Sequence, residues 1–160
     1  MKLSLDSDLL PKTHAIGGDA DIIYEYDKSN FYPKHCLLIE ATLSDGNNQR
    51  RMEMEPVSRH LGEHVLKTKN LFSYSMFITN DLNINVISDF RSRKDTIYYD
   101  RQNFDNYIKG MKIIPLQSSE LKKIIKSSKK YKELYKIFEE AFKSNLPPHE
   151  WYKTMVADIL

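Results

Sequence analysis

Three acidic residues near the start of the sequence have types and positions that suit chemistry. Glu40 lies inside the apolar run CLLIEATL, which is typical of a strand covered on both faces. Asp21 precedes the apolar run IIYEY, and Glu53 follows in a charged segment. A buried carboxylate without a partner is unstable, so Glu40 needs a cation, a hydrogen-bond donor or a proton. The ranges 20–26 and 35–43 contain no Lys or Arg to pair with it.

A divalent cation is one partner that would stabilise these carboxylates. Side chains alternate along a strand, so Glu40 and Thr42 share a face, and Asp21 belongs to the neighbouring strand of an expected hairpin. Two adjacent carboxylates repel each other, and a divalent cation relieves that repulsion. Oxygen ligands suit Mg²⁺, with Mn²⁺ as a substitute. The pattern predicts a metal site with Asp21, Glu40 and Glu53 as ligands.

A structural interpretation of the same residues stays open at this point. Asp21 would then cap or end its strand, and Glu40 would form an ion pair with Arg50 or Arg59. Glu53 would be a surface acid that interacts with a residue one helical turn away.

The elements that position these residues follow from hydrophobic periodicity. The expected strands cover about residues 20–26, 35–43, 71–79 and 111–116. The expected helices cover about 49–67, a segment opening at Ser118 as N-cap, 130–143, and a last helix after Pro147 and Pro148, with 82–94 as an ambiguous segment. This order predicts one α/β domain over 1–160, with a mixed central sheet flanked by helices and a helical part from about 118.

The helix expected over 49–67 has two faces, although Pro56 interrupts its pattern. The apolar face consists of Val57, Leu61 and Val65. The polar face consists of Gln49, Glu53, Pro56 and His60. If the apolar face packs on the sheet, the polar face looks towards Glu40, whereas Glu55 points to solvent.

Composition and charge exclude several classes of protein. The net charge is +2, but residues 19–55 hold eight acids against four bases and 109–143 hold ten lysines against four glutamates. A polyanion-binding protein could use such asymmetry, and a solvated lysine-rich helix face is the simpler interpretation. The single cysteine, Cys36, excludes an intramolecular disulfide. With no signal peptide and no apolar run near the roughly 18 residues of a membrane span, we expect a cytoplasmic protein.

Two segments, THAIGGDADIIYEY and LLIEATLSDGNNQRRMEMEPVSRHL, resemble the catalytic domain of the AlwI/MlyI group of type IIS restriction endonucleases. That group includes strand-nicking endonucleases and the small subunits of heterodimeric restriction enzymes. The matching motifs are His14-Ala15-Ile16-Gly17, Ala20-Asp21, Glu40-Ala41-Thr42-Leu43, Gln49-Arg50 and Glu53-Met54-Glu55-Pro56-Val57-Ser58-Arg59-His60. The clear match covers about Thr13–Leu61, and KIIPLQSSEL resembles a later strand-to-helix passage of the family.

The resemblance implies a PD-(D/E)xK nuclease core that hydrolyses phosphodiester bonds with Mg²⁺. Carried over by motif, Asp21 and Glu40 are the metal-binding pair, and Glu53 is the third catalytic acid. Thr42 stands where that superfamily has a lysine, and its hydroxyl cannot supply the lysine's charge. The residues that stay open as replacements are Gln49, Arg50, Arg59 and His60.

The expected substrate is double-stranded DNA. The basic residues expected to contact its phosphates are Arg50, Arg51, Arg59, Arg91, Arg93 and Lys94. His14, in the glycine loop before Asp21, is expected to line the site on the DNA side, with simple loop packing as the alternative.

The size of the chain bears on its partners, because a nuclease core fills most of it. No zinc finger or helix-turn-helix is left over to read bases. We therefore expect the small cleavage subunit of a type IIS enzyme, which nicks one strand while a larger partner subunit recognises the sequence. The alternatives are a standalone repair or mobile-element nuclease on the same core and a non-catalytic DNA-binding subunit.

Overall fold

The computed structural model describes residues 2–3, 20–44 and 46–160, and its centre is a mixed sheet with the strand order β1-β2-β3-β4-β7. The strands of this sheet are β1 (Lys2–Leu3), β2 (Ile22–Tyr26), β3 (His35–Thr42), β4 (Tyr74–Thr79) and β7 (Ile113–Gln117). The first three pair antiparallel, and β3, β4 and β7 run parallel to one another. The predicted β2–β3 hairpin is therefore confirmed.

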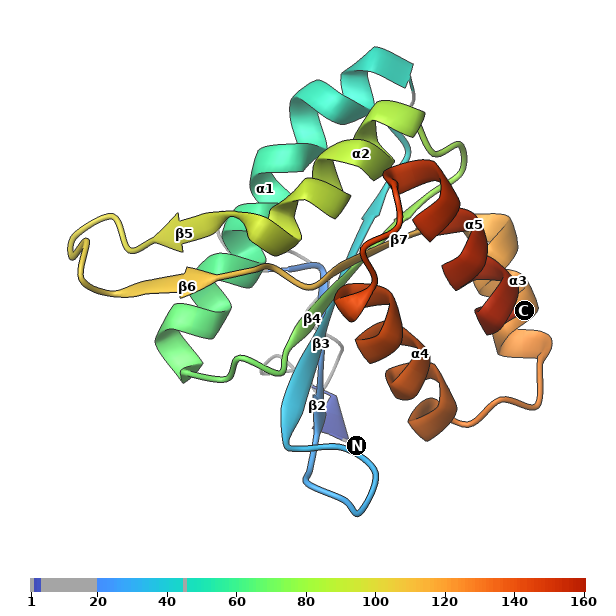
Figure 1. Cartoon of the computed structure of the whole chain (residues 1–160), viewed down its shortest axis with the longest axis horizontal. Coiled ribbons are helices and arrows are strands. Elements are labelled where there is room, and N and C mark those ends of the chain that lie inside the picture. Colours follow the sequence, from blue (N-terminus) through green and yellow to red (C-terminus); the bar gives the residue numbers. More distant parts are fainter. Residues whose placement is uncertain (1, 4–19, 45) are drawn as a thin grey trace, which may run out of the picture.

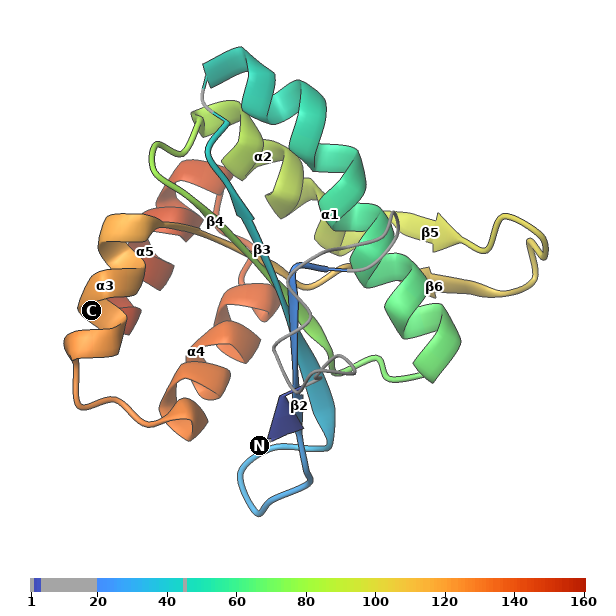
Figure 2. The same ribbon diagram turned by 180° about the vertical axis from the view of Figure 1, so that it is seen from behind.

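Helices cover both faces of the sheet (Figures 1 and 2). They are α1 (Gly46–Thr68), α2 (Ile84–Ser92), the 3-10 turn η1 (Arg93–Asp95), α3 (Ser118–Lys126), α4 (Tyr131–Lys143) and α5 (Pro148–Ile159). α1 lies on one face, α3 and α4 lie on the other, and α2 packs against both α1 and α5. Within the described residues, no helix is long and apolar enough to cross a membrane.

Strand parity divides the core into two layers. Cys36, Leu38 and Phe77 point towards α1, where they join its buried stripe of Val57, Leu61 and Val65. Leu37 and Met76 point the other way and pack with α4 and α5. The predicted apolar face of α1 is thus confirmed, and the polar face of the helix is left beside the end of β3.

Two expected boundaries were wrong for local reasons. β4 begins at Tyr74 rather than at about residue 71, because Asn70 closes a turn by accepting a hydrogen bond from the Phe72 backbone at 3.0 Å. Ser118 is the first residue of α3 and not its N-cap. Gln117 is the cap, and its backbone N–H donates to Glu120 at 2.7 Å. The ambiguous segment forms α2, capped by Asn83.

An unexpected hairpin, β5 (Ile97–Tyr99) and β6 (Tyr107–Lys109), projects from the body beside α1 (Figure 1). We call it the arm. Tyr98 on its inner face lies against Gly62 of α1, and a Cβ at Gly62 would stand 2.5 Å from the ring of Tyr98. The absence of a side chain at Gly62 therefore allows the arm to pack on the helix.

We predict that Gly62→Ala lowers the free energy of unfolding by about 1–3 kcal/mol, the usual cost of overpacking. The new methyl group would displace the ring of Tyr98 and the arm with it. Chemical denaturation measures the change. In a Tyr98→Ala background the same substitution should be close to neutral, and an equal loss in both backgrounds would contradict this explanation.

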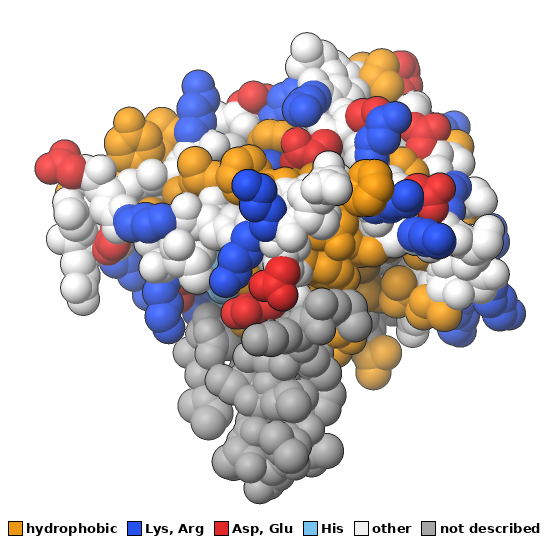
Figure 3. Space-filling model, turned by 90° about the horizontal axis from the view of Figure 1, so that it is seen from below, with side chains coloured by type: hydrophobic (Ala, Val, Ile, Leu, Met, Phe, Trp, Pro, Cys, Tyr) orange, Lys and Arg blue, Asp and Glu red, His pale blue; other side chains and the backbone are white. Residues whose placement is uncertain are grey.

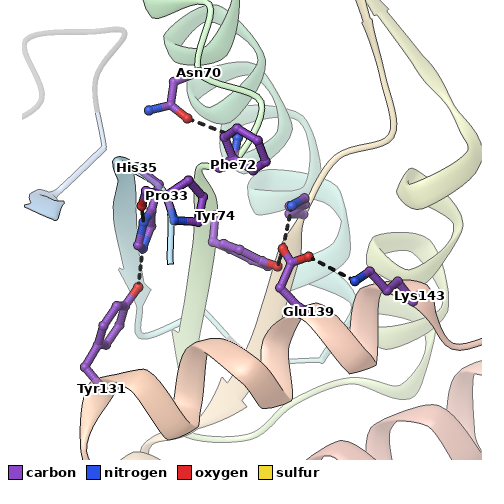
Figure 4. A network of polar contacts seen from close by, with 9 residues as sticks. Pro33, His35, Asn70, Phe72, Tyr74, Tyr131, Glu139 and Lys143 are labelled. Atoms are coloured by element: carbon purple, nitrogen blue, oxygen red, sulfur yellow. Dashed lines mark hydrogen bonds and ion pairs between the residues drawn. The ribbon is translucent and has the colours of Figure 1, made fainter. Parts of the chain in front are cut away.

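A buried polar network lies on the α4 side of the sheet (Figure 4). His35 is fully buried, its Nδ1 is 2.8 Å from the carbonyl oxygen of Pro33, and its Nε2 is 2.7 Å from the hydroxyl of Tyr131. The carbonyl can only accept, so Nδ1 carries the proton and Nε2 accepts from Tyr131. Burial lowers the pKa of His35 from its ordinary 6.5 and keeps the ring neutral.

This burial predicts a pH-dependent stability. An unfolded chain binds a proton on His35 below about pH 6.5, whereas the folded protein does so only at lower pH. The stability that comes from burying neutral His35 is therefore fully present above about pH 6.5, and it decreases as pH falls towards the lower pKa of the folded protein. We expect a smaller free energy of unfolding at about pH 5 than at about pH 7. His35→Phe should flatten this dependence, with exposed His149→Asn as the control; an unchanged slope in His35→Phe would contradict it.

Candidate active site

The register of the β2–β3 hairpin brings two acidic residues together. Ile22 pairs with Ile39, so Asp21 and Glu40, one position further along each strand, lie opposite each other. Parity puts both side chains on the face covered by α1. The predicted placement of the two carboxylates on adjacent strands is confirmed.

Asp21 is held by the neighbouring strand. Its Oδ2 accepts a hydrogen bond from the backbone N–H of Ala41 at 2.8 Å. This contact ends the pairing of β2 with β3, as the structural interpretation expected of Asp21. It also fixes the carboxylate beside Glu40, so the structural role and a chemical role are compatible.

Glu40 is paired with a histidine and not with an arginine. Its Oε1 lies 2.7 Å from Nδ1 of His60, and both residues are buried. Burial raises the pKa of Glu40, the hydrogen bond to His60 lowers it, the nearby Asp21 raises it, and the net direction is upward. The suggested ion pair with Arg50 or Arg59 is wrong, because Arg50 binds Asp89 at 2.6 Å and Arg59 binds Glu55 at 3.2 Å.

Glu53 is held by two hydroxyl groups at the end of β3. Its Oε1 accepts hydrogen bonds from Thr42 at 2.7 Å and from Ser44 at 3.1 Å. The oxygen of Thr42 in turn accepts the backbone N–H of Ser44 at 3.0 Å. Thr42, which stands at the position of the expected lysine, therefore contacts Glu53 and not Glu40.

Gln49 is a fully buried connector between loops. Its amide nitrogen has two protons, which it shares among three acceptors: Thr79 Oγ1 at 2.9 Å and the carbonyl oxygens of Ser44 and Asp81 at 3.0 Å each. Its amide oxygen accepts the backbone N–H of Asn83 at 3.0 Å. These contacts occupy the whole side chain and give Gln49 a structural role, whereas its predicted catalytic role remains a prediction.

The basic residues expected to contact DNA fall into different environments. Arg50, Arg51 and Arg93 are at least partly exposed, and the side chains of Arg51 and Arg93 make no hydrogen bond or ion pair with another described residue. Arg91 differs from the expectation: it is buried, donates to the carbonyl of Ser144 and lies 5.1 Å from the ring of Trp151. Lys94 also donates to that carbonyl, at 2.6 Å. Arg91 and Lys94 therefore fasten α2 and η1 to the α4–α5 connection, and Arg91 is not available to a phosphate.

Lys and Arg side chains do not gather in one place on the face seen in Figure 3. On this face they are spread from the left to the right of the view and interspersed with acidic and hydrophobic ones. The lysines of α3 and α4 are mostly exposed, which agrees with the simpler interpretation of a solvated helix face.

The sequence did not identify every residue at the site, and one expected residue is not described. His14 lies outside the described residues. Ser44, which binds Glu53, lies just after the strand expected over 35–43 and was not among the predicted site residues; its alternation with Glu40 and Thr42 would have indicated it. Asp89, the partner of Arg50, carried no sequence signal because it lies on another helix.

A divalent cation at this site would need oxygen ligands that lie close enough together to bind it. Among the described residues, no three His, Cys, Asp or Glu side chains are grouped as a metal site, so Glu53 is not placed with Asp21 and Glu40. Mg²⁺ commonly uses only one or two protein carboxylates and takes its other ligands from water and phosphate. Two adjacent carboxylates, one of which raises the pKa of the other, fit that requirement.

Comparisons with known proteins agree with the motif resemblance. The sequence profile of the AlwI restriction endonuclease family matches residues 1–154. A crystal structure of the small subunit (R.BspD6I2) of the heterodimeric restriction endonuclease R.BspD6I is similar, with a TM-score of 0.67 and 22% sequence identity, and the match covers 98% of this chain and 77% of that chain. At that identity the structural likeness shows the fold. No curated protein gives a significant sequence match.

Proposed function

Since the chain belongs to the AlwI restriction endonuclease family, we propose that it is a Mg²⁺-dependent endodeoxyribonuclease that hydrolyses a phosphodiester bond in one strand of double-stranded DNA. The observation that carries this proposal is the Asp21–Glu40 pair, which the β2–β3 register sets side by side. Carboxylates so placed are costly for stability and useful for binding a cation.

Asp21 and Glu40 would hold the metal ion. When bound, Mg²⁺ polarises the scissile phosphate and lowers the pKa of a bound water. His60 keeps Glu40 in one orientation through the 2.7 Å contact. Glu53 would orient the attacking water and accept its proton, since a carboxylate is a suitable general base when it lies within hydrogen-bond reach.

The DNA contacts follow from exposure. Of the six basic residues expected to contact DNA, Arg51 and Arg93 are the two whose side chains pair with no described residue, which leaves them available to phosphates. Arg50 and Arg59 would first exchange their partners Asp89 and Glu55. Such contacts position DNA and carry no sequence information.

Sequence recognition is assigned to a larger partner subunit, as in a type IIS heterodimer. The description of the similar structure as the small subunit of a heterodimeric restriction endonuclease supports this assignment. Within the described residues the helices and strands belong to the core sheet, its covering helices and the arm, and none forms a separate base-reading module.

A plasmid assay tests the proposal. The full chain is incubated with supercoiled plasmid in Mg²⁺, in Mn²⁺ or in EDTA, alone and with the large subunit of a heterodimeric restriction endonuclease of this family. We expect nicking only with metal, and sequence-specific nicking only with the partner. Specific cleavage by the chain alone would favour a standalone nuclease. DNA binding without cleavage in every condition would favour a non-catalytic subunit.

A further inference from the structure

We propose that the hydroxyl groups of Thr42 and Ser44 are positioning groups for Glu53, which hold one of its carboxylate oxygens and leave the other free to act on the water. The inference rests on the proposed function, because it specifies how one catalytic group of that site is aimed. Neither hydroxyl would touch DNA or metal, so both residues would act through Glu53.

The first argument is the use of the two carboxylate oxygens. Both hydroxyls donate to the same atom, Glu53 Oε1, at 2.7 and 3.1 Å. A hydroxyl has a single proton to donate, so each is fully used by this contact. No described residue hydrogen-bonds Oε2 of Glu53. Within the described part of the chain, the carboxylate is thereby fixed at one oxygen and open at the other, as a base that orients water requires.

The second argument is the stiffness of the backbone that carries the hydroxyls. Thr42 is the last residue of β3 and pairs with Thr79 of β4. The carbonyl of Ser44 accepts hydrogen bonds from Gln49 at 3.0 Å and from Thr79 at 3.3 Å. Glu53, in contrast, has a long side chain on α1 that is only half-buried. Groups on a rigid strand end can select one conformation of a flexible side chain, which is the essence of preorganisation.

A purely structural role is the competing explanation, because the same contacts also join α1 to β3. The two explanations differ in which measurement changes. Contacts that only connect α1 to β3 contribute to the free energy of unfolding, whereas contacts that orient the Glu53 carboxylate contribute to the rate of the chemical step. A correctly oriented Glu53 stabilises only the transition state. Removing the hydroxyls should therefore lower the rate of cleavage without lowering DNA affinity.

The test compares Thr42→Val, which has the same shape without the hydroxyl, with Thr42→Ser, which keeps it. Ser44→Ala and the Thr42→Val/Ser44→Ala double variant complete the set. Each is made in the wild-type chain and in a Glu53→Gln chain. Single-turnover plasmid nicking in Mg²⁺, with the partner subunit present, gives the rate; binding of the same DNA in Ca²⁺ gives the affinity.

We expect Thr42→Val to slow cleavage about tenfold, a loss of roughly 1.4 kcal/mol of transition-state stabilisation. Thr42→Ser should stay within about threefold of the wild-type rate, and the double variant should lose about a hundredfold. DNA affinity should not change. In the Glu53→Gln chain the same substitutions should have no further effect, because the hydroxyls act only through that carboxylate.

Thermal unfolding supplies a readout that does not depend on activity. The shifts in melting temperature from Thr42→Val and Glu53→Gln should be non-additive, since either change removes the full charge-assisted hydrogen bond. Additive shifts would mean that the bond is absent in solution and would overturn the inference.

Three kinetic results would also overturn it: equal losses for Thr42→Val and Thr42→Ser, the same loss in the Glu53→Gln chain as in the wild type, or wild-type rates in every hydroxyl variant. In all three the wild-type chain still cleaves and the proposed function stands. If the wild-type chain fails to cleave with metal and partner present, the proposed function and this inference fail together.

Discussion

Replacing Asp21 or Glu40 by alanine is expected to abolish DNA cleavage while the protein stays folded. We expect the single-turnover rate of nicking to fall by about 10³-fold or more, because the pair would hold the Mg²⁺ ion that stabilises charge on the phosphate. The fold should survive, since Asp21 lies partly exposed at a strand end and, among the described residues, its side chain hydrogen-bonds only to the backbone of Ala41.

Glu40 is the more demanding case, because its substitution also leaves His60 without a partner. Glu40→Gln avoids that loss, since the amide oxygen of the glutamine still accepts a hydrogen bond from Nδ1 of His60 while the negative charge is removed. Glu25→Ala is the matched control: it lies on β2, on the same face as Asp21, and is exposed. Undiminished Mg²⁺-dependent cleavage by Asp21→Ala or by Glu40→Gln would refute the assignment of the metal pair.

Replacing Gln49 by leucine is expected to cost about 3–5 kcal/mol of unfolding free energy, the second large effect. The substitution leaves the Asn83 backbone N–H and the carbonyl of Asp81 without their partner, whereas Thr79 and the carbonyl of Ser44 lose Gln49 but keep their own 3.3 Å hydrogen bond. An orphaned polar group costs about 1–3 kcal/mol when it is buried, and local relaxation and water entry reduce this cost where the group is only partly buried. Urea denaturation followed by circular dichroism measures the change.

The neighbouring Asn48 provides the control, since it is exposed on the same turn of α1. Asn48→Leu should leave stability within about 0.5 kcal/mol of wild type. A Gln49→Leu protein that keeps its full stability and loses only its cleavage rate would restore the prediction of a catalytic glutamine and contradict the connector role.

The hairpin and first helix were predictable because their signals are local. A nearly continuous apolar run marks β3, and a four-residue apolar repeat marks the buried face of α1. The polar face of that helix then had to meet the face of Glu40, and the contacts of His60 with Glu40 and of Glu53 with Thr42 agree.

The rest depends on tertiary packing that a single sequence does not encode locally. Arg91 looks like a surface cation in the sequence, but α5 and the preceding loop cover it, and its acceptor Ser144 is 53 residues away. The strands of the arm are only three residues each, too short for an alternating pattern, and Tyr98 is packed by a glycine on another element. Sequence patterns report periodicity along one element and not the neighbour that will cover it.

The order of the site residues in the chain has a consequence for how the site is built during folding. Asp21, Glu40, Glu53 and His60 all lie between residues 21 and 60, and the hydrogen bonds that hold their side chains within this segment span at most 20 residues. Closing short loops costs little chain entropy, so we expect these hydrogen bonds to form early. The contacts that stiffen them are longer: Gln49 reaches Thr79 and Asn83 over 30 and 34 residues. A nascent chain should therefore bring the site residues between positions 21 and 60 together before the longer-range contacts of Gln49 make them rigid.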